Sequence, residues 1–275
     1  MQRNGVTYIL GFCVAVCLVC AVIVSSSAVG LKEKQDLNKV LDRQKKVLSV
    51  AGIEFNDTAS SDEIQSLFSK RIKLVVVDLK TGKVDTSATK DAANFDQQKA
   101  KKDPSQSVDA PSNLAGVRRV PNKAMVYQVS QNEMDSSGSG FQLEQYIFPI
   151  EGKGLWSTLY GYLALESDGN SIKGITFYQH GETPGLGGEV DNPAWKAKWP
   201  GRKLFGPKGS SVSSWGEAKI TVKKGQAGTP EQDPYQVDGL SGATITGNGV
   251  THLVRFWMGD NGFGKYIRNV VGQAS

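Results

Sequence analysis

The sequence predicts an α+β protein with a single N-terminal transmembrane helix, followed by a mainly antiparallel sheet with flanking helices. Three observations predict this class: one apolar span near the N-terminus, helical periodicity at both ends of the remaining chain, and strand-like segments between them. About 240 residues follow the span, enough for one sizeable core or two small ones. We expect an anchor over residues 1–31, a connecting and peripheral part over 32–116, and the main domain over 117–275.

The apolar span has the length of a membrane anchor. No charged residue lies between Arg3 and Lys32, and Val6 to Val24 is almost wholly apolar. About 20 such residues suit one bilayer crossing. Ser26-Ser27-Ala28 resembles a signal-peptide cleavage site, but secretory apolar regions usually run only ~7–15 residues, so we favour a retained anchor. Long domains translocate largely regardless of charge, and we expect the main body outside the cytoplasm.

Cysteine, histidine and charge narrow the possible functions. Cys13, Cys17 and Cys20 all lie in the span on one helical face, where they are expected to pack as small apolar residues. A metal site at a subunit interface is the alternative. The rest of the chain has no cysteine, and His180 and His252 lack a metal-ligand pattern, so no disulfide and no metal site are expected there. The net charge of +5 is dispersed, which does not indicate nucleic-acid binding.

The segments of the main body are predicted from periodicity and turn residues. Helices are expected at Leu31–Ala51 and Asp62–Lys70. Strands are expected at Ile72–Val77, Met125–Val129, Phe141–Pro149, Ser157–Glu166, Ser171–Gln179 and Ala218–Lys223. Asp168-Gly169-Asn170 indicates a hairpin turn. The polar stretch Thr89–Asn113 has few large apolar residues, so we expect an irregular surface segment that buries little.

The segment from Asp238 to Thr246 combines a carboxylate, two glycines and three hydroxyls ahead of a predicted helix. The helix is indicated by an apolar stripe at Val250, Leu253, Val254 and Trp257. Asn248 or Thr246 would cap it. Helix N-termini attract anions, so Thr244 lies where a phosphate would bind. The alternative is a Ser/Thr/Gly turn that only caps the helix.

Two glycine-rich segments lie upstream, Glu151–Ser157 before a predicted strand and His180–Glu189 after one. Each could be an ordinary turn. Glycine also marks places where the backbone closely approaches a ligand. A planar aromatic ligand needs flat apolar contacts and polar groups at its edge. Together these segments are consistent with a cofactor pocket.

These motifs resemble the FMN-binding domain family with a covalent flavinylation motif, an acidic residue followed closely by Ser/Thr-Gly-Ala-Thr. The matching residues are Asp238, Ser241, Gly242, Ala243 and Thr244. The Gly-Leu-Trp-Ser stretch at 154–157 and the Glu-Thr-Pro-Gly-Leu-Gly stretch at 182–187 occur upstream in the family's order. Most of the chain, including the span, is similar to the C subunits of Na+-translocating NADH:quinone oxidoreductases. The flavin-bearing G subunits of Rnf electron-transport complexes are a weaker match.

The resemblance implies FMN attached to Thr244 through its phosphate by a flavin transferase, with Thr246 as the nearest rival acceptor. Ser241, Gly242 and Ala243 would bond the phosphate, and Asp238 would help the transferase recognise or activate the hydroxyl. Leu155, Trp156, Thr183, Gly185 and Leu186 would surround the flavin ring. Glu182 would bond the ring edge or tune its potential, or would only stabilise its loop.

The resemblance further implies an electron-relay subunit of the bacterial inner membrane with its soluble domain on the periplasmic side. Its partners would be the other membrane subunits of the reductase, and it would not be catalytic alone. The chain lacks a Gly-rich βαβ fingerprint, so we expect no direct NADH binding. A soluble part without cysteine leaves FMN as the expected redox group. An Rnf-type subunit, a membrane-anchored scaffold without flavin and a free-standing extracytoplasmic reductase remain alternatives.

Overall fold

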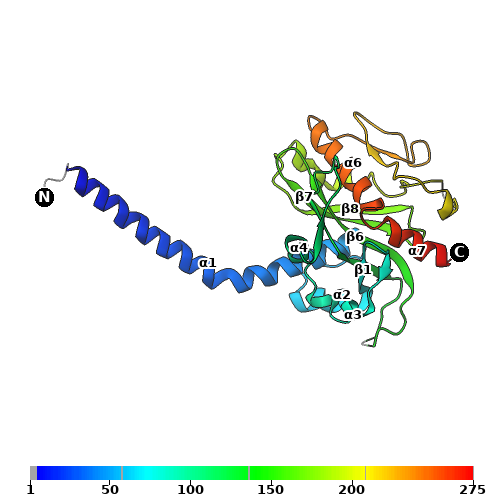
Figure 1. Ribbon diagram of the computed structural model, residues 1–275, viewed down its shortest axis with the longest axis horizontal. Helices are drawn as coiled ribbons and strands as arrows, with labels where there is room; N and C mark the ends of the chain where they lie inside the picture. Colours follow the sequence, from blue (N-terminus) through cyan, green and yellow to red (C-terminus); the bar gives the residue numbers. More distant parts are fainter. Residues whose placement is uncertain (1–4, 57, 136, 208, 275) are drawn as a thin grey trace. The chain divides into compact units, whose positions relative to one another are not determined.

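The computed structural model describes residues 5–56, 58–135, 137–207 and 209–274, and its ribbon is drawn in Figure 1. The chain divides into two compact units, Met1–Arg43 and Gln44–Ser275. The second unit contains the sheet and the helices that pack on it, so it contains every residue expected to contact a cofactor.

Helix α1 (Val6–Val50) forms the first unit and continues into the second. Its most apolar 18-residue window has a mean hydropathy of 2.8, and none of that window is buried within the protein. By length and composition, α1 can therefore cross a membrane. The helix predicted at Leu31–Ala51 is the continuation of the apolar span, because no proline interrupts the segment between them.

The main sheet has six strands in the order β2-β1-β5-β6-β7-β8, and all its neighbours are antiparallel. Its strands are β1 (Ile72–Asp78), β2 (Lys83–Val84), β5 (Lys123–Ser130), β6 (Leu143–Lys153), β7 (Thr158–Glu166) and β8 (Ile172–Gln179). The predicted hairpin is confirmed, since β7 pairs with β8 and Gly169 turns between them at φ +63°. The α+β class with flanking helices is confirmed.

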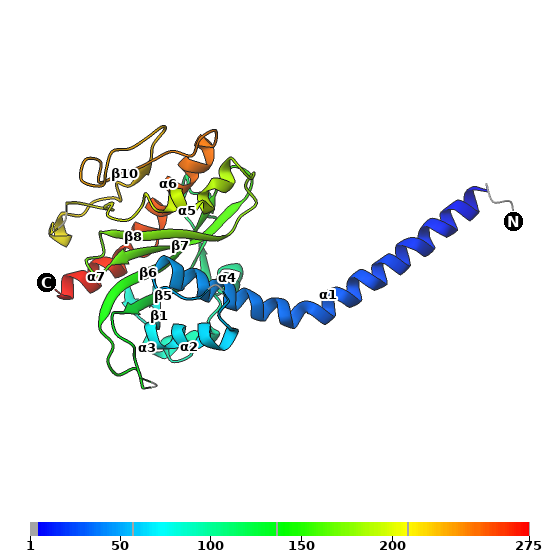
Figure 2. The same cartoon turned by 180° about the vertical axis from the view of Figure 1, so that it is seen from behind.

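Alternation along each strand divides the apolar residues between the two faces of the sheet. Val75 and Val77 of β1 join the main core, whereas Val76 between them joins a smaller cluster on the opposite face. Helices α6 (Thr244–Met258) and α7 (Gly264–Ala274) cover the first face, and α2 (Ser61–Arg71) and α3 (Thr86–Thr89) contact β1 on the other (Figures 1 and 2). The period-2 pattern of a strand fixes this assignment, because a slip of one residue would exchange the faces.

Aromatic residues join α6 and α7 to the centre of the sheet. Phe148 of β6 lies 4.9 Å from Phe263, measured between ring centroids, and Tyr146 lies 6.1 Å from Tyr266. The indole N–H of Trp257 donates a 2.7 Å hydrogen bond to the backbone carbonyl of Glu151. A buried indole normally needs such a partner. These contacts hold α6 and α7 against β6.

The polar segment Thr89–Asn113 is more ordered than predicted, and the expectation of an irregular segment that buries little is wrong. It contains η1 (Ala92–Asn94), α4 (Gln97–Lys102) and β3 (Ser107–Asp109), which pairs with β4 (Arg119–Pro121). Ala92, Ala100 and Ser107 are buried. Small side chains fill this layer, and Asp96 caps α4, so few large apolar residues are needed.

The region between β8 and α6 consists mostly of short elements. These are η2 (Gly187–Asp191), α5 (Pro193–Lys196), η3 (Val212–Ser214), β9 (Thr221–Val222) and β10 (Gln236–Val237). The strand predicted at Ala218–Lys223 is thus reduced to Thr221–Val222, and it pairs in parallel with β10 rather than joining the main sheet. Conversely, β6 extends beyond the predicted Phe141–Pro149 to Lys153, because β7 pairs with it along that whole length.

Candidate functional site

Helix α6 begins at Thr244, one turn earlier than a cap at Asn248 would require. The N-cap position is Ala243, and no side chain caps it. The predicted cap at Thr246 or Asn248 is therefore wrong, because both residues lie within the helix. Gly242 has φ +68°, a conformation that glycine adopts without steric cost, and it turns the chain into the helix. The first N–H groups of α6 thus lie at the loop that contains Thr244.

The two threonines of this turn have opposite environments. Thr244 is exposed, whereas Thr246 is fully buried. The Thr246 hydroxyl donates a 2.7 Å hydrogen bond to Oε2 of Glu182. A reagent that modifies a hydroxyl must reach it, and of these two threonines Thr244 is the accessible one.

Thr244 lines a cavity of about 430 Å³, the acceptor cavity, together with residues from three segments. Its charged residues are Lys198, Lys223, Lys224 and Asp238. A phosphate is attracted to lysine ammonium groups and to a helix N-terminus, and the acceptor cavity has both. Sequence reasoning missed the three lysines, because Lys198 is distant in sequence and no motif includes them.

Asp238 lies in this cavity, but protein groups already occupy its carboxylate. Lys198 Nζ lies 2.5 Å from Oδ2, and the backbone N–H of Ala227 donates to Oδ1 at 2.9 Å. Burial raises the pKa of Asp238, but these hydrogen bonds and the charge of Arg202 outweigh it and hold the pKa below its usual value. Asp238 is therefore an anion paired with Lys198 at neutral pH.

Glu182 connects three segments that are far apart in sequence. Its carboxylate accepts hydrogen bonds from the backbone N–H groups of Leu155, Trp156 and Ser157 at 3.0–3.2 Å, in the turn between β6 and β7. It also accepts the bond from Thr246 of α6. These contacts are those of a loop-stabilising carboxylate, which is one of the two roles expected for Glu182. A direct bond to the flavin ring stays a prediction.

The electrostatics of Glu182 follow from these bonds. Burial raises its pKa, whereas the bonds from Thr246 and from the three backbone N–H groups lower it, and the net result is a lowered pKa. The residue is 6% exposed, and its carboxylate remains ionised at neutral pH. Little room is left around it, since a Cβ on Gly154 or Gly187 would lie 2.6 Å from one of its oxygens.

Exposed apolar side chains surround this junction. Leu155 is 40%, Trp156 71% and Leu186 44% exposed. A Cβ on Gly242 would lie 2.9 Å from Cδ2 of Leu186, which brings Leu186 next to the acceptor turn. Exposed apolar groups beside polar donors are what a planar, partly polar ligand requires. The residues present therefore fit a phosphate-bearing aromatic cofactor such as FMN.

The remaining predicted residues belong to the same loops. Gly185 has φ +76°, and the Thr183 carbonyl accepts the N–H groups of Leu186 and Gly188, so both shape the turn before η2. Ser241 is exposed at the acceptor cavity. The Ala243 N–H already donates to the Leu240 carbonyl at 3.1 Å. Ala243 is thus engaged in the turn itself.

The two histidines have different surroundings. His180 Nε2 lies 3.1 Å from Asp191, and its Nδ1 accepts the backbone N–H of Glu182 at 3.3 Å. His252 lies on α6, where burial lowers its pKa. Among the residues that the structure describes, no cluster of His, Cys, Asp or Glu could hold a metal ion.

Comparison with known proteins decides the family. Residues 154–259 match the family model described as "FMN-binding domain", which includes all three motif segments. The C subunit of the Na+-translocating NADH-quinone reductase from Vibrio campbellii is 43% identical over 98% of this chain and 97% of its own length. The Yersinia pestis protein of the same name is 41% identical over 94% of this chain and 90% of its own length.

The chain belongs to the C-subunit family of this reductase. The crystal structure of Shewanella oneidensis NqrC is similar to it, with a TM-score of 0.69 and 36% identity over 84% of this chain and 96% of that one. The crystal structure of the corresponding subunit from Parabacteroides distasonis gives a TM-score of 0.59 at 27% identity, over 87% and 96% of the two chains. The expected resemblance, the FMN-binding domain and the membrane-anchored character of the chain are confirmed.

Proposed function

We propose that the chain is a membrane-anchored flavoprotein subunit of a Na+-translocating NADH:quinone oxidoreductase, and that its FMN is joined to Thr244 by a phosphoester. The observation that carries this proposal is the contrast between the exposed Thr244 and the buried, hydrogen-bonded Thr246. When bound, the flavin supplies one- and two-electron redox chemistry that the side chains lack.

The acceptor cavity supplies the groups that hold the phosphate. Lys223 and Lys224 provide positive charge, whereas Lys198 is paired with Asp238. The N-terminus of α6 provides backbone N–H groups. Ser241 and Gly242 complete the turn around Thr244. Asp238, held by Lys198, would present a fixed carboxylate to the flavin transferase.

The glycine-rich loops position the flavin ring. Leu155, Trp156 and Leu186 offer it apolar contact, and Thr183 and Gly185 shape the loop around it. Glu182 fixes the turn of Leu155 and Trp156 relative to α6. A ring docked between these loops would keep a constant orientation for electron transfer to neighbouring subunits.

The ester linkage suits an exported domain. We place this domain on the periplasmic side of the bacterial inner membrane, with α1 as the anchor and the N-terminus in the cytoplasm. No cytoplasmic flavin pool would refill the site there, and a covalent bond prevents loss of the cofactor. The names of the relatives reported above favour a Na+-translocating reductase over an Rnf-type complex.

The experiment that tests the linkage is co-expression of the full chain with a flavin transferase. Denaturing gels scored for flavin fluorescence, and intact mass, report the covalent flavin. We expect a fluorescent wild-type band that disappears in Thr244→Val and persists in Thr246→Val. A fluorescent Thr244→Val band would refute the assignment, and an unchanged wild-type mass would favour a scaffold without flavin.

A further inference from the structure

A strongly basic groove lies beside the turn that holds Trp156. The groove has a volume of about 670 Å³, and its lining includes Trp156 itself. Its charged residues are Lys101, Lys102, Arg118, Arg119, Glu151 and Lys153. Five of these six are basic, although the whole chain has 32 basic and 27 acidic residues. We call this feature the basic groove. Its charge is concentrated rather than typical of the surface.

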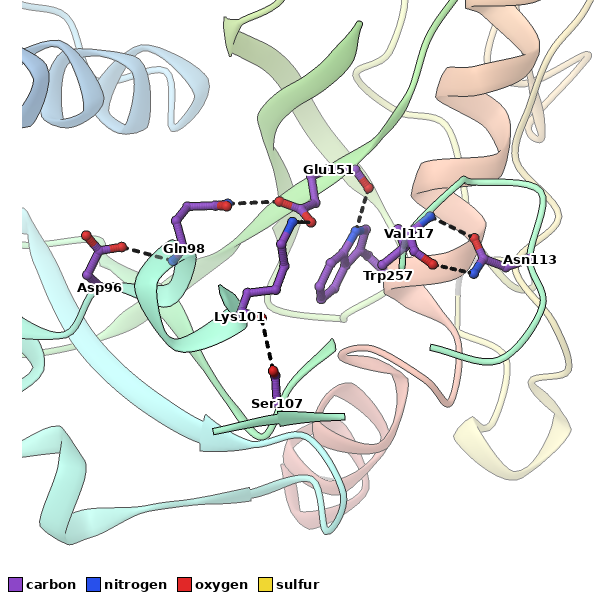
Figure 3. Close-up of polar contacts among 8 residues, drawn as sticks. All are labelled: Asp96, Gln98, Lys101, Ser107, Asn113, Val117, Glu151 and Trp257. Carbon is purple, nitrogen blue, oxygen red and sulfur yellow. Dashed lines mark hydrogen bonds and ion pairs between the residues drawn. The ribbon is translucent and has the colours of Figure 1, made fainter. Parts of the chain in front are cut away.

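Glu151 is the acidic residue that lines the basic groove, and its carboxylate is buried and paired. Glu151 is 5% exposed, and its side chain accepts hydrogen bonds from Lys101 and, at 2.8 Å, from Gln98 Nε2 (Figure 3). Its backbone carbonyl accepts the indole N–H of Trp257. These contacts join α4 to the end of β6 and pair the negative charge of the groove.

Three cations remain at the rim of the groove. Arg119 pairs with Asp109 at 2.6 Å. Lys102, Arg118 and Lys153 are exposed, and none of the ion pairs among the described residues includes them. They come from α4, from the segment before β4 and from the end of β6. A charge spread over three segments matches an extended acidic chain better than a single small anion.

Trp156 adds an apolar anchor at the same place. Trp156 is 71% exposed. Its backbone N–H donates a 3.0 Å hydrogen bond to the carboxylate of Glu182. An exposed Trp on a fixed turn loses little entropy on contact, and Trp and Arg are enriched where protein interfaces have their strongest contacts. A basic groove with an indole at its end is therefore organised for a protein partner.

We propose that the basic groove docks an acidic segment of a neighbouring subunit of the membrane complex, with an apolar side chain of that segment against Trp156. The proposal rests on the proposed function, because it requires such a neighbour. It adds a specific surface and its chemistry. The docked segment would contact the same turn that is expected to touch the flavin ring.

The first test reverses the free charges in the full chain within the assembled complex. We expect the triple variant Lys102→Glu, Arg118→Glu, Lys153→Glu to reduce the recovery of co-purifying subunits on the order of tenfold. The remaining complex should dissociate completely at a lower salt concentration than the wild-type complex does. The matched control reverses three exposed lysines outside the groove, Lys80→Glu, Lys90→Glu and Lys173→Glu. Equal behaviour of the two triple variants would overturn the proposal.

The second test identifies the occupant and distinguishes docking from misfolding. A photo-cross-linking residue at position 118 in the assembled complex should attach to an acidic segment of another subunit. Reversing the acidic residues of that segment to Lys should restore assembly with the triple variant, which a misfolded chain could not do. Attachment to lipid, to nucleic acid or to a second copy of this chain, or failure of the charge exchange, would refute the proposal.

Covalent flavin, scored in the same samples, reports the proposed function independently. Wild-type complex without flavin at Thr244 would refute the flavin linkage but would leave the groove result intact. Flavin-bearing complex that ignores the charge reversals would refute the groove alone.

Discussion

The hydroxyl of Thr246 donates a 2.7 Å hydrogen bond to the carboxylate of Glu182, across 64 positions of sequence. This bond joins the first turn of α6 to a loop that also holds the turn between β6 and β7. It gives the two threonines of the acceptor turn separate roles. Thr246 fixes the helix, and Thr244 presents an exposed side chain to the acceptor cavity.

Glu182→Gln should destabilise the protein by about 1–3 kcal/mol, because a glutamine amide would direct N–H groups at donors that now reach a carboxylate. Thermal and denaturant unfolding of the full chain in detergent measure this loss. The difference between wild type and variant should also depend on pH. The folded-state pKa of Glu182 lies below the ordinary 4.5, so its contribution is complete above that pH and is lost as pH falls through the folded value.

The control for Glu182 is Glu217→Gln, which alters an exposed carboxylate. We expect it to change the free energy of unfolding by less than about 0.5 kcal/mol, as is usual for surface positions. A Glu182→Gln variant as stable as this control at neutral pH would contradict the connecting role of Glu182.

Thr246→Val should cost about 1.5–3 kcal/mol, because it removes one hydrogen bond to a buried charged acceptor while conserving shape. Thr246→Ser retains the donor and should lose less. Calorimetric unfolding of both variants without flavin measures the difference. If valine and serine were equally tolerated, the bond would contribute nothing measurable to stability.

Gly249→Ala should destabilise α6 although alanine is the better helix former. A Cβ at this position would lie 2.4 Å from the carbonyl oxygen of Lys153, so the helix would have to move away from β6. We expect a loss of about 1–3 kcal/mol from this overpacking, measured by unfolding. In α7, a Cβ on Gly272 meets no atom within 4 Å. Gly272→Ala should therefore gain a few tenths of a kcal/mol, and a similar gain at Gly249 would contradict the close approach.

The fold could be predicted wherever a local pattern dominated. The β-branched run in Ile72–Val77 predicts β1, because strand propensity is local. The turn residues Asp168-Gly169-Asn170 predict the β7–β8 hairpin in the same way. The short helices within Thr89–Asn113 were missed. Their stability comes from Asp caps and from contacts with distant strands, as when Gln97 accepts the backbone N–H of Met125 at 3.0 Å.

The candidate site also combines features that the local sequence predicts with features that depend on distant contacts. The acceptor motif predicts Thr244 and the glycine-rich loops as the site, because each is a run of consecutive residues. Spacing alone could not rank Thr244 against Thr246, since both follow the same glycine turn. It also gave no sign of Lys198, Lys223 and Lys224, which reach the acceptor cavity through chain reversals rather than through sequence spacing.

The sequence by itself determined the apolar span, the strand-forming segments, the cysteine-free main body and the family motifs, since each depends on residue type and local spacing. Only the tertiary structure decided which threonine is accessible, what Glu182 binds and where positive charge gathers. Burial and hydrogen bonding depend on which distant segments meet, and the packing of α6 on β6 brings them together.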